Sequence, residues 1–331
     1  MGAEESKPLS RRAIGLGLLK LGVGVVLLVL LVRYLAPSWS ELRTTVTPDY
    51  RYFFVALAGT GTATAVGAQR WRLLAELMGG ARLPYAYYYH YLALTRLIGQ
   101  FTSVAVMDAV GRGVALSAAN KDGPRIGQHI GALLVERLLD LLLPIITFVW
   151  AVASVQRWVD IDPWLSLALL TVVFSVCVVP FLDPAARTVA ALLGWVQRLR
   201  GRTTSVVPVP APPSLAARIG VLSLTRYACV ILQFWGTGAL AGLSLDALTI
   251  AYATPISQLT AFVGLTPGGI GIQDAGWAGA LTWLGVSGSV IAAYILVTRV
   301  AVLCIFAVLS LASLPFARGA ADAAAAPQPE A

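Results

Sequence analysis

Six stretches of the sequence are long and apolar enough to cross a bilayer, and they constrain the fold more than any other feature. A helix spans the hydrocarbon core with about 20 apolar residues. The stretches lie at approximately 15–36, 53–74, 128–154, 164–182, 216–243 and 289–316. Because 58% of the 331 residues are hydrophobic and only 12% are charged, a soluble enzyme, a coiled coil and a disordered chain are excluded. We therefore predict an all-α polytopic membrane protein with six transmembrane helices.

Two further apolar regions, at 85–116 and 246–286, are interrupted near their centres. The first contains Met107-Asp108-Ala109-Val110-Gly111-Arg112-Gly113, and the second contains Thr266-Pro267-Gly268-Gly269-Ile270-Gly271. Glycine and proline break helices, and broken backbone at membrane depth is tolerated only where it lines a cavity or packs on protein. We predict that both regions are re-entrant helical hairpins.

The placement of lysine and arginine favours this layout, because cytoplasmic loops carry an excess of both. With two hairpins and a cytoplasmic N-terminus, twelve basic loop residues face the cytoplasm and three face outward, namely Arg43, Arg51 and Arg157. If each region crossed once instead, the division would be six against ten. We expect a multi-pass protein of the cell membrane with both termini in the cytoplasm.

The two interrupted regions also resemble each other. Gly99-Gln100-Phe101-Thr102-Ser103 matches Ser257-Gln258-Leu259-Thr260-Ala261, and an arginine, Arg137 or Arg299, follows each match by about 38 residues within an apolar helix. Each half then has three spans and one hairpin, which gives the halves opposite topology, as in many transporters. We predict an inverted repeat.

The domain boundaries follow from the repeat. Repeat one covers about 15–160 and repeat two about 161–316 of a single transmembrane domain at 15–316. A cytoplasmic N-terminus at 1–14 precedes this domain. We expect the Ala/Pro-rich tail at 317–331 to be disordered and cytoplasmic.

Nine ionisable residues fall within the predicted membrane region. A charge at the bilayer centre costs at least ~2.5–3.5 kcal/mol, so nine would be prohibitive unless they were paired or hydrated. We therefore expect a polar cavity inside the bundle. The nine residues are Arg96, Asp108, Arg112, Glu136, Arg137, Asp140, Arg226, Asp274 and Arg299.

Glu136 and Asp140 are four residues apart and share one helix face, with Arg137 on a neighbouring face. In a functional interpretation Arg137 binds phosphate, and the acids orient it or contact a cationic group. In a structural interpretation these residues form ion pairs that hold helices together. Spacing alone leaves both open.

Three other assignments rest on position. Arg299 has no nearby acid in its own helix, which favours a ligand-binding role. Asp274 follows Gly271 and either caps a helix N-terminus or presents a midplane charge. Asp108 and Arg112 are spaced to pair with each other.

Two arginines are expected near the membrane interfaces. Arg70, in Arg70-Trp71-Arg72, marks the cytoplasmic end of the second span, and Arg226 is placed to extend toward an interface.

Three motifs carry a family resemblance over approximately residues 15–316. Leu265-Thr266-Pro267-Gly268-Gly269-Ile270-Gly271-Ile272-Gln273-Asp274-Ala275 resembles the glycine-rich signature of the lysylphosphatidylglycerol synthase transmembrane family, also called the flippase-like domain family. Val135-Glu136-Arg137-Leu138-Leu139-Asp140 and Arg70-Trp71-Arg72-Leu73-Leu74 resemble two of its helix motifs. Two features depart from the family pattern: Asp274 stands where glutamate is usual, and the first break lacks a proline.

The resemblance implies movement of lipid head groups between leaflets by a stand-alone member without the transferase domain, and therefore not an enzyme. The arginines would bind phosphate, while the acids would balance charge or contact a cationic group. The expected substrate-binding residues are Arg112, Glu136, Arg137, Asp140, Gln258, Pro267, Gly268, Gly269, Gly271, Gln273, Asp274 and Arg299.

The substrate expected is a phospholipid or aminoacyl-phospholipid with an anionic or zwitterionic head group. One alternative is a flippase for a polyprenyl-phosphate-linked carrier in envelope glycan assembly. Another is a non-transporting partner that anchors a glycosyltransferase through the loop at 184–215. A homo-oligomer is also compatible with the sequence. No ligand spacing predicts a metal or cofactor, and no aromatic–basic pattern predicts nucleic-acid binding.

Overall fold

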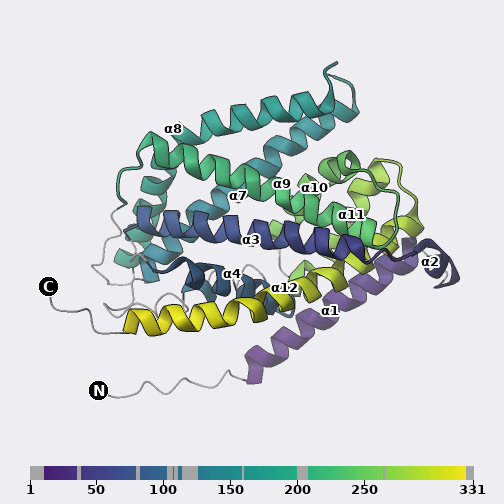
Figure 1. Ribbon diagram of the computed structural model, residues 1–331, viewed down its shortest axis with the longest axis horizontal. Coiled ribbons are helices and arrows are strands. Elements are labelled where there is room, and N and C mark those ends of the chain that lie inside the picture. Colours follow the sequence, from purple (N-terminus) through teal and green to yellow (C-terminus); the bar gives the residue numbers. More distant parts are fainter. Residues whose placement is uncertain are drawn as a thin grey trace.

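The computed structural model describes residues 11–35, 39–79, 83–102, 107, 111–113, 126–158, 160–199, 208–263 and 266–325. Within these ranges every regular element is a helix, which confirms the all-α class (Figure 1). The elements are α1 (Arg11–Leu35), α2 (Trp39–Thr45), α3 (Arg51–Leu77), α4 (Tyr85–Gly99), α7 (Ile126–Val155), α8 (Pro163–Leu199), α9 (Pro213–Leu240), α10 (Ala247–Val263), the 3-10 turn η2 (Pro267–Gly269), α11 (Ile272–Trp283) and α12 (Gly288–Ala325).

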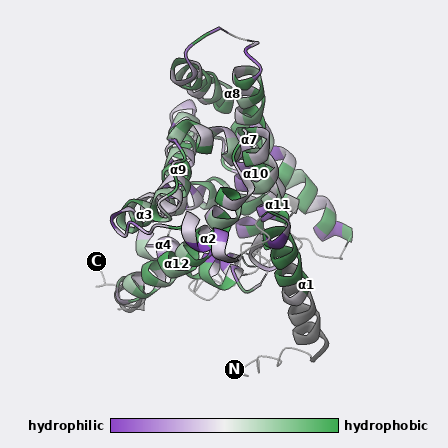
Figure 2. Cartoon of the chain, turned by 90° about the vertical axis from the view of Figure 1, so that its right-hand side faces the viewer, coloured by the Kyte–Doolittle hydropathy of each residue, from purple (hydrophilic) through white to green (hydrophobic). Residues whose placement is uncertain are grey.

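Four of the described helices are long and apolar enough to cross a membrane, and they coincide with four of the predicted spans. Their apolar portions are Gln128–Val155, Pro163–Leu199, Pro213–Leu240 and Gly288–Ala317. The predicted spans at 15–36 and 53–74 are also helical, as α1 and α3. Figure 2 shows hydrophobic residues along α7, α8 and α12, as expected for helices that face lipid.

Two helices extend beyond their predicted ends. We predicted a span to 182 and a loop at 184–215, but α8 continues through Pro180 and Pro184 to Leu199. Prolines are tolerated inside membrane helices because neighbouring groups satisfy the freed backbone. Likewise α12 runs to Ala325, past the predicted end at 316 and into the segment predicted to be disordered.

Helices α3 and α9 form the centre of the bundle and cross closely through small residues (Figure 1). A Cβ atom built on Gly59 would lie 2.9 Å from the backbone nitrogen of Gln233, and one on Gly236 would lie 2.9 Å from that of Ala56. Glycine at these two positions therefore lets the helix backbones approach, as small residues do at membrane helix interfaces.

Backbone hydrogen bonds fix the directions of these two helices. Asp49 N donates to Leu240 O over 3.0 Å, which joins the start of α3 to the end of α9. Val209 N donates to Leu77 O over 2.8 Å, which joins the end of α3 to the segment before α9. The helices are therefore antiparallel. We call the end of the bundle at Asp49 and Leu240 the first end, and the end at Leu77 and Val209 the second end.

The predicted interruption of the second apolar region is present. Helix α10 stops at Val263, η2 follows, and α11 begins at Ile272. The backbone turns through positive φ angles of 58° at Gly268, 68° at Gly269 and 84° at Gly271, which glycine adopts without a steric penalty.

The two interrupted regions meet. Helix α4 ends at Gly99, and Gly268 N in the second break donates to Thr102 O just after α4, over 2.8 Å. The second break therefore lies beside the end of α4, although about 165 residues separate them in sequence. Of the predicted first break at 107–113, residues 108–110 lie outside the described residues.

Candidate functional site

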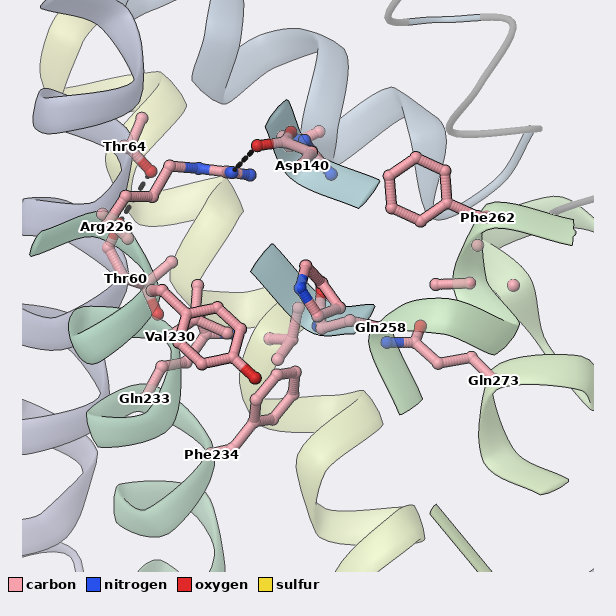
Figure 3. A pocket seen from close by; sticks show the side chains of 18 of the residues that line it. Thr60, Thr64, Asp140, Arg226, Val230, Gln233, Phe234, Gln258, Phe262 and Gln273 are labelled. Atoms are coloured by element: carbon pink, nitrogen blue, oxygen red, sulfur yellow. Dashed lines mark hydrogen bonds and ion pairs between the residues drawn. The ribbon is translucent and has the colours of Figure 1, made fainter. Parts of the chain in front are cut away.

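A cavity of about 470 Å³ lies where these broken elements face α3, α7, α9 and α12 (Figure 3). Ten of the twelve predicted site residues line it, while Pro267 and Gly271 do not. The ten are Arg112, Glu136, Arg137, Asp140, Gln258, Gly268, Gly269, Gln273, Asp274 and Arg299.

The two acids of α7 are joined by an arginine that the sequence interpretation placed elsewhere. Arg70 Nη2 lies 2.9 Å from Glu136 Oε1 and 2.6 Å from Asp140 Oδ1, and Arg70 Nη1 donates to Ser223 Oγ over 3.1 Å. The Arg70 side chain is only 1% exposed. Arg70 is therefore not exposed at an interface but is an interior ion-pair residue that connects α3, α7 and α9, and the side of the membrane on which α3 ends stays a prediction.

Arg112, in the first interrupted region, also pairs with α7. Its Nη1 donates to Glu136 Oε2 over 2.8 Å, and its guanidinium lies 5.0 Å from the centre of the Trp71 ring. Asp108, the partner predicted for Arg112, lies outside the described residues. Glu136 thus accepts from two buried arginines, one from α3 and one from the first break.

Arg226 of α9 donates to the same oxygen of Asp140 as Arg70 does. Its Nη1 donates to Asp140 Oδ1 over 2.7 Å, and 22% of the side chain is exposed (Figure 3). Prediction of an interfacial position for Arg226 was therefore wrong. Asp140 is held between Arg70 and Arg226, and it connects α7 of the first half to α9 of the second.

Arg299 of α12 holds the second break in place. Its Nε lies 2.8 Å from Asp274 Oδ1, its Nη1 lies 2.6 Å from Gly268 O, and its Nη2 lies 3.3 Å from Gly269 O. Asp274 Oδ2 also accepts from Gly271 N over 2.8 Å, which caps the start of α11. The capping interpretation of Asp274 is confirmed, and Arg299 does have an acid partner, supplied by another helix.

Arg137, which we predicted to be the principal phosphate ligand, lies at the edge of the same cavity. Its guanidinium is 5.8 Å from the centre of the Phe262 ring near the end of α10. It is half-buried, as is Arg96 of α4, which also lines the cavity.

Positive charge predominates on the cavity wall. Among the described residues, three carboxylates line it, those of Glu136, Asp140 and Asp274. Six arginines from the same part of the chain line it, namely Arg70, Arg96, Arg112, Arg137, Arg226 and Arg299, which gives these residues an excess of three positive charges. The planar guanidinium group can donate two parallel hydrogen bonds to two oxygens of a phosphate or a carboxylate, so this wall suits an anion. Among the described residues, no three His, Cys, Asp or Glu side chains gather as a metal site would require.

The sequence interpretation missed Arg70 and Arg226 because their partners are 66 to 86 residues away. A local signal does exist for Arg70. It lies on the same helical face as Thr60, Ala63 and Gly67, which are small and buried at the contact with α9 and α4. An arginine on a stripe of small residues points inward, whereas one on the opposite face would reach the interface.

Comparison with known proteins identifies a family. The sequence matches the family described as lysylphosphatidylglycerol synthase TM region over residues 17–310. No curated protein matches the chain.

Proposed function

Since the chain belongs to the lysylphosphatidylglycerol synthase TM region family and is a multi-pass membrane protein, we propose that it is a lipid translocase. It would carry the head group of a phospholipid between the two leaflets while the acyl chains stay in the bilayer. It would lie in the cell membrane with both termini in the cytoplasm, and it would move lipid rather than modify it.

The observation that carries this proposal is the positive excess on the wall of a cavity inside an apolar bundle. Ionisable residues inside a membrane protein face water-filled or ligand-filled cavities, so an excess of three positive charges on the wall favours an anionic ligand. A phosphodiester head group supplies one negative charge and several acceptor oxygens. The partly exposed arginines, Arg137, Arg226 and Arg299, are the groups that would contact it.

The arrangement of the breaks supports entry from both leaflets. Helix α10 starts near the first end, since only six residues separate it from the end of α9. Helix α12 begins there too, since a Cβ on Gly288 would touch the backbone of Leu35. Helix α4 starts near the second end, and α7 begins there, where Gly131 lies against Met78. Two re-entrant hairpins from opposite sides would have this geometry, with their tips meeting at Gly268 and Thr102.

Helix contacts support the inverted repeat in the same way. The first hairpin helix, α4, packs on α12, and the second hairpin helix, α10, packs on α7. Similarly, α1 contacts α12 and α8 packs on α7. Each half thus places its first helix and its hairpin on the last helix of the other half. Rocking of one half against the other would then expose the cavity to each leaflet in turn.

Lipid transfer across reconstituted vesicles tests the proposal. Purified protein should accelerate the exchange of acyl-labelled phosphatidylglycerol between leaflets, measured by reduction of the outer-leaflet label with dithionite. Arg226→Gln should slow the exchange about tenfold or more. The variant removes the charge-assisted hydrogen bond proposed between the guanidinium and the lipid phosphate, which contributes about 1.5–3 kcal/mol.

Arg72→Gln is the matched control and should leave exchange near the wild-type rate. Like Arg226, Arg72 forms an ion pair, with Glu76 at 3.3 Å, but it lies on α3 and does not line the cavity. No protein-dependent exchange of any phospholipid tested would refute the proposal.

A further inference from the structure

The three carboxylates that line the cavity in the described part of the chain already have cationic partners. Glu136 accepts from Arg70 and Arg112, and Asp140 accepts from Arg70 and Arg226. Asp274 accepts from Arg299 and from the N–H of Gly271. An ammonium group entering the cavity would therefore have to displace an arginine to reach a carboxylate.

The remaining polar lining is uncharged and consists of amides and hydroxyls. Four glutamines line the cavity, namely Gln100, Gln233, Gln258 and Gln273, together with Thr60, Thr64, Ser223, Thr266 and Thr298. Figure 3 shows Gln258 and Gln273 reaching into it from the side of α10 and α11, opposite Gln233 of α9. Each amide offers two N–H donors and one acceptor oxygen, which is the complement of a vicinal diol.

Gln258 is the amide best placed to meet a ligand. It is half-buried, and no hydrogen bond of its amide to another described residue is present. By contrast, Gln273 Nε2 lies 3.4 Å from Ser257 Oγ and Gln100 Nε2 lies 3.3 Å from Arg96 O. An amide facing a cavity in a membrane protein requires partners, and the hydroxyl groups of a ligand supply both donors and acceptors.

From these observations we infer that the substrate is a lipid with a phosphate and a hydroxyl-rich head group, either a polyol or a sugar, and not an aminoacylated one. This inference rests on the proposed translocation and specifies its substrate class. The phosphate lies against the arginines, and the hydroxyl groups lie against Gln258, Gln273 and Gln233. An aminoacyl ester instead brings an ammonium group toward a wall with excess positive charge, where repulsion in a medium of low dielectric disfavours it.

Competing lipids in one vesicle preparation test the inference. The lipids are short-chain phosphatidylinositol, a short-chain polyprenyl phosphate hexose and lysyl-phosphatidylglycerol, each at trace concentration. We expect one of the first two to move at least about tenfold faster than the lysyl lipid, and the faster of them identifies the lipid class. Equal or faster movement of lysyl-phosphatidylglycerol would overturn the inference while leaving translocation intact.

A binding measurement distinguishes failure of the proposed translocation from failure of the head-group assignment. If no lipid moves, translocation is refuted, and the thermal unfolding midpoint of the detergent-solubilised protein then decides the head-group assignment. Greater stabilisation by the two hydroxyl-rich lipids than by the lysyl lipid supports it, and equal or absent stabilisation overturns it.

Gln258→Leu supplies the residue-level test. It should reduce the transfer of the preferred lipid about fivefold or more, with no increase in the transfer of the lysyl lipid. Gln156→Leu is the control, because Gln156 is exposed beyond the end of α7 and does not line the cavity. Equal rates for Gln258→Leu and wild type would contradict the assignment of the amide.

Discussion

Gly268 N donates a hydrogen bond to Thr102 O over 2.8 Å, and this contact joins the second break to the residues just after α4, in the first half of the chain. Gly268 has a φ angle of 58°, and a Cβ atom there would lie 2.8 Å from Gln100 O. The contact therefore requires glycine for its backbone conformation and for the closeness of the approach. It holds the second break beside the end of α4 at the charged cavity, which Gly268 and Gln100 both line.

Gly268→Ala should separate the second break from the residues just after α4. A non-glycine residue in the left-handed region costs roughly 1–2 kcal/mol, and the clash with Gln100 adds to that. We expect a lower thermal unfolding midpoint and loss of lipid transfer. Gly279→Ala in α11 is the control, since nothing lies within 4 Å of its Cβ position, and it should be neutral or slightly stabilising. Equal unfolding midpoints and equal transfer rates for the two variants would contradict the contact between Gly268 and Thr102.

Glu136→Gln should destabilise the bundle strongly. Glu136 is 2% exposed and compensates Arg70 and Arg112, so its neutralisation leaves buried positive charge unpaired at a cost of about 3–5 kcal/mol. Glu76→Gln removes a partly exposed pair with Arg72 and should cost less than about 1 kcal/mol. Denaturant unfolding of both variants in detergent measures the difference, and similar losses would show that Glu136 is not buried as described.

Arg299→Lys should loosen the second break although it keeps the charge. The guanidinium contacts Asp274 and the carbonyl oxygens of Gly268 and Gly269 together, which a single ammonium group cannot reproduce. We expect transfer to fall about tenfold or more and protease sensitivity near Gly268 to rise. Arg187→Lys, at a 68% exposed side chain paired with Asp183, is the control. Wild-type lipid transfer by Arg299→Lys would mean that the simultaneous guanidinium contacts with Asp274, Gly268 and Gly269 are not required.

Single cysteines should report both ends of the second hairpin on one side of the membrane. The background replaces the three free cysteines, Cys177, Cys229 and Cys304, with alanine. Cysteines at Ser244 and Ser287, both exposed, should react with an impermeant maleimide from the same side, and one at Ser214 should react from the other. If 246–286 crossed the membrane once, Ser287 would instead share the side of Ser214.

Local signals in the sequence predicted the elements that form the cavity. Apolar length predicted the long helices, Pro267 and the glycines after it predicted the second break, and the spacing of Glu136 and Asp140 predicted a shared face toward the interior. These features depend on backbone preference and helical periodicity, which short segments carry by themselves.

The ion-pair partners of the charged residues could not be predicted from the neighbouring sequence. Glu136 pairs with Arg70, which is 66 residues away, and Asp274 pairs with Arg299 from another helix. Which arginine neutralises which acid depends on how helices pack, and in the sequence every arginine at a helix end resembles an interfacial one. The end of α8 was missed for a related reason, since its prolines break isolated helices but are accommodated within a packed membrane helix.

If the protein is a lipid translocase, its arginine-lined cavity holds a phosphate-bearing lipid head group, and native mass spectrometry of the purified protein can detect that lipid. We predict that wild-type protein and Arg72→Gln each retain one phosphate-containing lipid through delipidating detergent, and that Arg226→Gln loses it. Retention of no lipid by the wild type, or equal retention by all three proteins, would contradict the claim.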